Sequence, residues 1–323
     1  MDEVAYRQVE ERLWRSVDQQ PQEHVVELPR LGIRVRVQEV GVGEPVLYLH
    51  GGPNAGSTWA PLVARTDGLR NLLVDRPGTG LSEPLAIPPV DLRRFADVFV
   101  ADVLDALRLE RAHVVASSFG GFLALRAAAA TPDRFDRMVQ MACPAGAPGM
   151  AVPPFMRAIA TPLLGRLIAA LPPNERAARS ILRQIGHGAS LDAGRIPDVF
   201  VDWYLGLQRH TPTMQHETRL IAALLSPRGR VRPALALTDE LLGQIDVPTH
   251  FLWGADDPFG DEAVAQRVAG AMGDATVEMV LDAGHLPWID DAAHAAVSVE
   301  DHLTARPVAA RPQRRGPGGL TDR

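Results

Sequence analysis

HVVASSFGG, residues 113–121, joins a short apolar run to an alanine-rich segment through a turn that contains two serines. Strong helix formers follow over residues 122–130, until Thr131 and Pro132 interrupt them. The stretch therefore predicts a strand, a sharp turn and a helix. A serine on such a turn stands clear of the sheet, where a nucleophile is accessible.

The turn has small residues where the strand and the helix must approach each other. Ala116 precedes Ser118 by two positions, and Gly120 and Gly121 follow it by two and three. The pattern approximates the nucleophile elbow G-x-S-x-G, with alanine in place of the first glycine. Centring it on Ser117 would put bulky side chains at both small positions, so Ser118 is the better candidate nucleophile. An ordinary turn that carries a Ser-Ser pair is the alternative interpretation.

The bulk composition limits the classes of function. Of the 323 residues, 46% are hydrophobic and 22% charged, as in a globular protein. The net charge of −6 argues against nucleic acids or anionic membranes as main partners. All 33 basic residues are arginines, which excludes Schiff-base chemistry, a pyridoxal phosphate anchor and a P-loop lysine.

The single cysteine, Cys143, excludes an intramolecular disulfide and a cysteine-rich metal site, and its apolar neighbours predict a buried structural thiol. The charged amino terminus lacks the apolar segment of a signal peptide. No apolar run approaches the length of a transmembrane helix either. We therefore expect a cytoplasmic protein with no metal and no cofactor.

Short, continuously apolar runs alternate with helical patterns along most of the chain. A polar helical extension is predicted over residues 1–22, and an antiparallel hairpin at a sheet edge over 24–28 and 33–40. The apolar runs lie at residues 46–49, 72–74, 114–116, 138–143, 250–253 and 277–281. They indicate strands covered on both faces, and the alternation with helices such as 92–107 implies a mostly parallel α/β sheet.

One long interval, residues 144–245, breaks this alternation. A structureless loop of that length is improbable, and helical patterns occur in it at residues 155–169, 175–184, 196–207 and 213–225. We interpret the interval as a helical cap inserted into an α/β core of residues 23–143 and 246–304. The tail, 305–323, is rich in Pro, Gly and Arg and is predicted to be disordered.

A serine nucleophile needs a base and a carboxylate, and both follow predicted strands. Asp256 and Asp257 come directly after strand 250–253, in WGADDP, and His285 comes after strand 277–281, in VLDAGHLPW. The order serine, aspartate, histidine along the chain is that of the α/β-hydrolases.

The chain resembles an α/β-hydrolase-fold enzyme with a helical cap over about residues 24–303. Four signatures carry the resemblance: HGGPN at 50–54, DRPGTGLSE at 75–83, the elbow at 116–121, and the pair WGADDP and AGHLPW. The resemblance implies that Asp257, the third residue after the glycine of the WG turn, orients His285. Asp256 is then a turn or capping residue, although the reverse assignment stays open. His285 is the implied general base for Ser118.

The resemblance also implies an oxyanion hole made by two backbone N–H groups, those of Phe119 and Gly52. His50 is expected to hold the loop, with a second catalytic base as the alternative. Asp75 and Arg76 are assigned to a structural turn at the floor of the site, with no chemistry. Aromatic side chains are candidates for an apolar acyl or aryl pocket, or alternatively for ordinary core packing. They are Trp59, Phe122, Trp203, Tyr204 and Trp288.

A serine at the elbow counts against haloalkane dehalogenases and epoxide hydrolases, which use aspartate there. The leading hypothesis is a serine hydrolase that cleaves an ester, thioester or lactone of a small, largely apolar substrate through an acyl-enzyme. Carbon–carbon bond hydrolysis is one alternative, and a proline-iminopeptidase-like amidase is another, since HGGP resembles those peptidases while DRPGTGLS and ASSFGG do not. A non-catalytic small-molecule binder is the alternative from a different class. The oligomeric state is not predicted.

Overall fold

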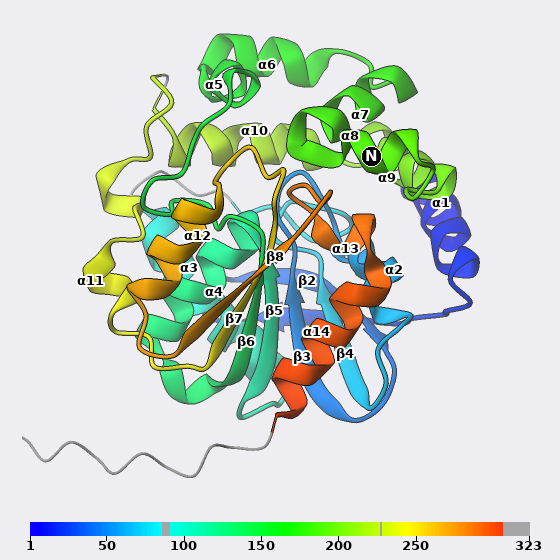
Figure 1. Cartoon of the computed structure of the whole chain (residues 1–323). Helices are drawn as coiled ribbons and strands as arrows, with labels where there is room; N and C mark the ends of the chain where they lie inside the picture. Colours follow the sequence, from blue (N-terminus) through cyan, green and yellow to red (C-terminus); the bar gives the residue numbers. More distant parts are fainter. Residues whose placement is uncertain (86–90, 227, 306–323) are drawn as a thin grey trace, which may run out of the picture.

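A central sheet of eight strands organises the molecule, seen here in a computed structural model that describes residues 1–85, 91–226 and 228–305 (Figure 1). The strand order is β1-β2-β4-β3-β5-β6-β7-β8. β1 and β2 form an antiparallel hairpin, β2 pairs antiparallel with β4, and all other pairs are parallel. The bounds are β1 Gln22–Leu28, β2 Ile33–Val40, β3 Glu44–Leu49, β4 Leu69–Val74, β5 Ala112–Ser117, β6 Phe135–Met141, β7 Thr249–Gly254 and β8 Ala275–Val280. The predicted α/β fold is confirmed.

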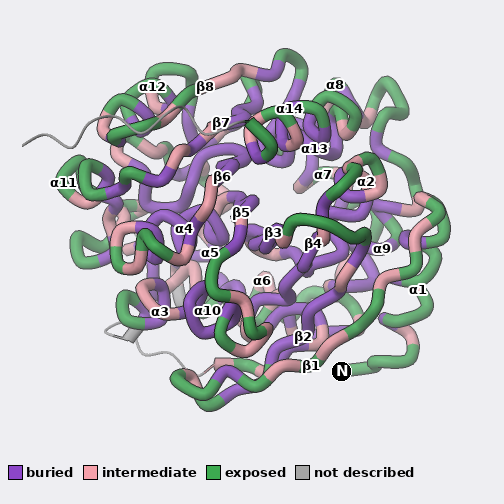
Figure 2. The backbone as a smooth tube through the Cα atoms, turned by 90° about the horizontal axis from the view of Figure 1, so that it is seen from below, coloured by how far each residue is buried: buried purple, intermediate pink, exposed green. Residues whose placement is uncertain are grey.

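Helices cover both faces of this sheet (Figure 1). One layer contains α3 Asp91–Ala106, α4 Ser118–Ala130, α11 Asp239–Leu242 and α12 Glu262–Gly270, and the other contains α2 Ala60–Val63, α13 Pro287–Asp290 and α14 Ala292–Thr304. Side chains of a strand point alternately to its two faces, so Leu47 and Leu49 belong to one hydrophobic core while Val46 and Tyr48 belong to the other. The inner strands β3 to β7 are accordingly mostly buried in Figure 2, whereas the edge strands β1 and β8 are partly exposed.

The turn between β5 and α4 has the strained geometry that the small residues predict. Ser118 has a positive φ of 53°, which is uncommon for a residue with a side chain. A Cβ atom on Gly120 would lie 2.0 Å from the carbonyl oxygen of Leu49, and one on Gly121 would lie 2.5 Å from Gln140 Oε1. Glycine at these positions is therefore what lets α4 pack against the ends of β3 and β6.

Between β6 and β7, the helical segments up to α10 lie above the carboxyl ends of the strands (Figure 1). They are α5 Pro154–Ala160, α6 Pro162–Ala170, α7 Glu175–Leu182, the π-helical turn η3 Arg183–His187, α8 Gly188–Asp192, α9 Asp198–His210 and α10 Thr213–Leu224. The single helix predicted over 155–169 is two helices, because Pro162 cannot continue the first one and Thr161 has extended backbone.

The predicted helix at the start of the chain is α1 Glu3–Ser16, which packs against α9. Most of the tail that was predicted to be disordered lies outside the described residues. Among the described residues, no helix combines the length and hydrophobicity needed to span a bilayer.

Candidate active site

Asp257 and His285 meet where β7 and β8 end. His285 Nδ1 lies 2.9 Å from Asp257 Oδ2, and both side chains are buried. The backbone N–H groups of Cys143 and Phe259 also donate to the Asp257 carboxylate, each at 2.9 Å. Asp256, the open alternative, is exposed to solvent. The carboxylate that touches the histidine is therefore that of Asp257.

Ser118 and His285 line the same pocket. The Ser118 side chain is partly exposed, whereas Ser117 is fully buried and its hydroxyl has no hydrogen-bond partner in the described part of the chain. Gly51 lies against the nucleophile candidate, because a Cβ atom there would be 3.3 Å from Ser118 Oγ. Of the two serines, only Ser118 is presented to a ligand in this pocket.

The HGGP loop is held by a buried network around His50. His50 Nδ1 lies 2.7 Å from the Gly51 carbonyl oxygen, and the backbone N–H of Arg76 donates to His50 Nε2 at 3.2 Å. Burial and the neighbouring Arg76 guanidinium hold the pKa of His50 well below its ordinary value. A neutral imidazole with both nitrogens engaged holds the loop and has no nitrogen free to act as a base.

The two residues expected to form an oxyanion hole, Gly52 and Phe119, also line the pocket. Phe119 lies in the first turn of α4, where backbone N–H groups have no carbonyl partner within the helix. Ser117, the N-cap residue, makes no capping hydrogen bond through its side chain in the described structure. The helix start therefore keeps donors available beside Ser118, as oxyanion stabilisation requires.

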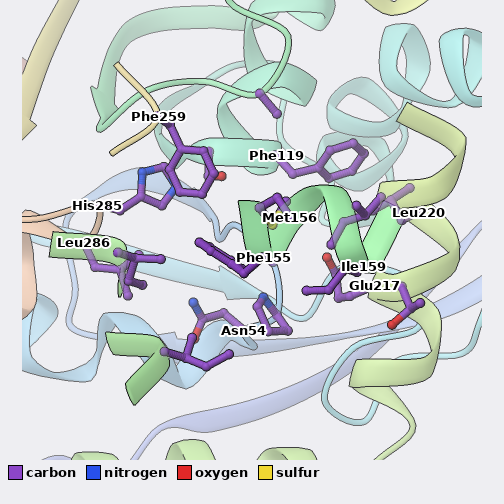
Figure 3. Close-up of a pocket in the computed structure, with 18 of the residues that line it drawn as sticks. Asn54, Phe119, Phe155, Met156, Ile159, Glu217, Leu220, Phe259, His285 and Leu286 are labelled. Atoms are coloured by element: carbon purple, nitrogen blue, oxygen red, sulfur yellow. The ribbon is translucent and has the colours of Figure 1, made fainter. Parts of the chain in front are cut away.

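The pocket lies between the sheet edge and the cap, and its walls are mainly apolar (Figure 3). Cap residues supply most of the walls, namely Met150, Val152, Phe155, Met156, Ile159, Ile181, Leu182, Ile185, Leu220, Ile221, Leu224 and Leu225. In Figure 3, His285 and Glu217 lie on opposite sides, and the Phe259 ring lies beside His285, with 4.4 Å between ring centroids. Among the described lining residues Glu217 has the only carboxylate, and none is an arginine.

Four of the five aromatic residues proposed for this pocket lie elsewhere. Trp59 and Trp288 pack on each other, with centroids 4.0 Å apart, in the core beneath α2 and α13. Trp203 is buried in the same core and does not line the cavity, and Phe122 is buried in the opposite core beside Phe119. Of the five, Tyr204 lines the pocket. Large aromatic side chains fill protein cores as readily as binding sites, and their positions in the sequence did not separate the two.

Arg76 and Glu217 form a buried ion pair that sequence reasoning missed. Arg76 donates to the carbonyl oxygens of His50 and Gly51 at 2.7 and 3.0 Å, and its Nη2 donates to Glu217 Oε1 at 2.8 Å. A Cβ atom on Gly52 would lie 1.9 Å from Glu217 Oε2, so this carboxylate of helix α10 covers the HGGP loop. Arg76, assigned only to a turn, thus ties the core to the cap.

The remaining chemical groups near the site have structural surroundings. Burial and the nearby Asp257 carboxylate raise the pKa of the Cys143 thiol well above its ordinary value. Within residues 1–85, 91–226 and 228–305, no group of three or more His, Cys, Asp or Glu side chains is placed to share a metal ion. The arrangement can support acyl transfer: an accessible serine, a histidine oriented by a carboxylate, and backbone donors for an oxyanion.

A model of the alpha/beta hydrolase family matches residues 46–299 of the chain. Among curated proteins, a 2-hydroxy-6-oxononadienedioate/2-hydroxy-6-oxononatrienedioate hydrolase of Cupriavidus pinatubonensis is 29% identical to the chain over 262 residues. The alignment covers 78% of this chain and 84% of that protein. The chain is 27% identical over 261 residues to a 2-hydroxy-6-oxo-6-phenylhexa-2,4-dienoate hydrolase of Comamonas testosteroni. That alignment covers 78% of this chain and 84% of the relative.

Solved structures share the same architecture. A carboxylesterase of Bacillus subtilis superposes with a TM-score of 0.72 at 20% identity, over 94% of this chain and 98% of that one. A 2-hydroxy-6-oxo-6-phenylhexa-2,4-dienoate hydrolase of Rhodococcus superposes with a TM-score of 0.69 at 16% identity, over 88% of this chain and 100% of that one. At these low sequence identities, the structural likeness shows a shared fold and nothing more specific.

Proposed function

The chain belongs to the alpha/beta hydrolase family, and from this premise we propose that it is a serine hydrolase acting on esters, thioesters or lactones of small, largely apolar acids. Ser118 Oγ attacks the carbonyl carbon, and His285 takes the hydroxyl proton and returns it to the departing alkoxide or thiolate. Water then cleaves the acyl-enzyme by the same route. The backbone N–H groups of Gly52 and Phe119 stabilise the oxyanion.

The observation that carries the choice of substrate is the charge of the pocket. Its walls are mainly apolar, and no arginine is among the described residues that line it. Arg76, which with Arg219 lines the adjoining hollow, is already paired with Glu217. A substrate carboxylate bound here would lack a cation and would face the Glu217 carboxylate, which is unfavourable in a poorly solvated site. Neutral acyl compounds meet no such penalty.

Carbon–carbon bond hydrolysis is the second candidate, and the sequence relatives favour it. The names of those relatives denote dienoate and dioate substrates, which carry one or two carboxylates. A nucleophilic serine, a histidine and an oxyanion hole also suit the cleavage of a ketone, provided that the pocket admits the rest of the molecule. The two candidates therefore differ in the charge that the pocket must accept.

A substrate panel separates these candidates. Purified protein is assayed on p-nitrophenyl esters of increasing acyl length, on lactones and on a 2-hydroxy-6-oxo-dienoate. The proposal expects kcat/KM for neutral esters to exceed that for the dienoate by at least about a hundredfold, or about 2.7 kcal/mol of transition-state binding. A clear preference for the dienoate would replace ester hydrolysis by carbon–carbon hydrolysis as the function.

The substitution Glu217→Gln is expected to relax the discrimination against anionic acyl groups. The glutamine side chain keeps an acceptor for Arg76 but removes the negative charge, so the guanidinium then attracts a carboxylate at this wall. The ratio of kcat/KM for p-nitrophenyl butyrate to that for p-nitrophenyl hemisuccinate should fall by about tenfold or more. Glu175→Gln, which removes a carboxylate from the exposed cap surface, is the matched control. An unchanged ratio in Glu217→Gln would show that this carboxylate does not sense the acyl group.

A further inference from the structure

The loop that carries His285 is held by three hydrogen bonds, which three successive backbone N–H groups of the loop donate. Gly284 donates to Asp290 Oδ2 at 2.9 Å, His285 donates to the carbonyl oxygen of Ile185 at 2.9 Å, and Leu286 donates to His187 Nε2 at 3.2 Å. Ile185 and His187 belong to the cap, in the π-helical turn η3. The backbone of the candidate general base is therefore fixed largely from the cap.

His187 and Asp290 form a second buried histidine–carboxylate pair, separate from that of Asp257 and His285. His187 Nδ1 lies 2.8 Å from Asp290 Oδ2 and 3.0 Å from Oδ1, and both side chains are almost completely buried. Because the Leu286 N–H can only donate, His187 Nε2 must accept. The proton of a neutral His187 then resides on Nδ1 and is donated to Asp290. One tautomer satisfies every polar atom of the pair.

The kink in the cap makes this contact possible. Gly186 has a positive φ of 96°, and the backbone of Ile185 is also non-helical. A Cβ atom on Gly186 would lie 2.3 Å from the Asp256 carbonyl oxygen and 2.7 Å from the Gly284 Cα atom. The kink is thus wedged between the turn that leads into Asp257 and the loop that carries His285, and a side chain there would push them apart.

We propose that His187 is a positioning residue: paired with Asp290, it holds the His285 loop in register with Asp257 and thereby couples the cap to general-base catalysis. The proposal rests on the function proposed above for His285. Neither His187 nor Asp290 is among the described residues that line the pocket, and His187 touches its wall only through the backbone of Leu286. Loss of the pair should therefore act on the chemical step rather than on substrate binding.

The size of the effect follows from how sharply proton transfer depends on geometry. A displacement of about 1 Å in a catalytic group can cost about a hundredfold in rate. Methionine at position 187 fills a similar volume without an acceptor or donor that could replace the imidazole nitrogens. Glutamine offers a donor and an acceptor spaced much like the two imidazole nitrogens, so it can bridge Asp290 and the Leu286 N–H.

The kinetic test compares His187→Met, His187→Gln and Ser190→Ala, with turnover expressed per active site titrated by a fluorophosphonate. Ser190 is equally buried in the adjacent helix α8, but its partner is Arg195 rather than the His285 loop. We expect His187→Met to lower kcat about a hundredfold with KM changed less than about threefold. His187→Gln should recover most of that loss, and Ser190→Ala should match the wild type. Wild-type kcat per titrated site in His187→Met, or no recovery in His187→Gln, overturns the proposal.

A spectroscopic arm is independent of any substrate and of whether the methionine variant folds. Long-range ¹H–¹⁵N spectra of the wild-type protein at mildly alkaline pH should show a neutral His187 protonated on Nδ1. Protonation on Nε2 contradicts the hydrogen bond from Leu286 and overturns the proposal. If the wild type hydrolyses none of the panel and is not labelled while this tautomer is observed, the proposed function fails, whereas the predicted hydrogen bonding of the His187–Asp290 pair is confirmed.

Discussion

Replacing Ser118 by alanine is expected to reduce turnover of the best ester by about a millionfold, as for comparable serine triads. The hydroxyl that bonds covalently to the acyl group is lost, and no other nucleophile faces the pocket at the elbow. The fully buried Ser117 cannot substitute for it. The measurement is kcat on freshly purified variant, at protein concentrations high enough to detect the residual rate.

Ser117→Ala is the matched control for this experiment. Ser117 lies one position earlier, its hydroxyl has no partner within the described chain, and its removal should change kcat less than about threefold. If Ser118→Ala retained most of its activity while Ser117→Ala lost it, the register of the elbow would be wrong. Loss of activity in both variants would indicate that the turn itself, rather than one hydroxyl, had been disturbed.

Replacing Asp257 by asparagine is expected to lower kcat by about 10⁴-fold with little change in KM, the effect known for this substitution in a serine triad. An amide nitrogen facing His285 Nδ1 would favour the tautomer with its proton on Nε2, which cannot accept the serine proton. The carboxylate also accepts from the backbone N–H groups of Cys143 and Phe259, and an amide oxygen can still satisfy one of them. The fold should survive, which circular dichroism would verify.

Asp256→Asn is the control, because the two carboxylates are neighbours in the chain and differ in surroundings. Asp256 is exposed, and its backbone N–H donates to the carbonyl oxygen of Ala283, a bond that the substitution preserves. We expect its kcat to stay within about threefold of the wild type. A large loss in Asp256→Asn with a small one in Asp257→Asn would reverse the assignment.

Much of the fold was predictable because its signals are local. Continuous apolar runs locate the parallel strands, the alternating run at 33–40 marks strand β2, and prolines mark the helix ends. The alternation in β2 does not mean an exposed face, because Arg36 and Gln38 are buried as well. The split between α5 and α6 was missed, although Pro162 stands in the pattern, since the apolar periodicity continues across it. Strand order was beyond prediction, because it depends on pairing between distant segments.

The residues of the candidate site likewise fall into those that local sequence motifs predict and those that only distant contacts bring to the site. Ser118, Asp257 and His285 each follow a strand within a short motif, and parallel strands bring such positions to one edge of the sheet. Glu217 and His187 stand in no motif, because their partners are 141 and 103 residues away in the chain. The prediction that five aromatic residues line the pocket holds for Tyr204 but not for the other four, for a related reason. A hydrophobic side chain gives the same sequence pattern whether it faces a cavity or a core.

The cap covers the pocket and also contacts two loops of the candidate active site. Through Glu217 the cap reaches Arg76 and the HGGP loop, and through His187 and Ile185 it reaches the loop of His285. Both contacts join cap residues to the polar groups on which the proposed acyl transfer depends. A cap substitution that alters substrate preference is therefore also expected to alter kcat wherever it disturbs one of these contacts.

The most direct measurement is the intact mass of the folded protein after treatment with a fluorophosphonate, followed by peptide mapping. Ser118 Oγ bonds to phosphorus, fluoride leaves, and His285 accepts the hydroxyl proton. The account predicts one adduct per chain, on Ser118, with none in Ser118→Ala and a much slower reaction in Asp257→Asn. No adduct on the folded wild-type protein, or an adduct on another residue, would contradict the claim that Ser118 is its activated nucleophile.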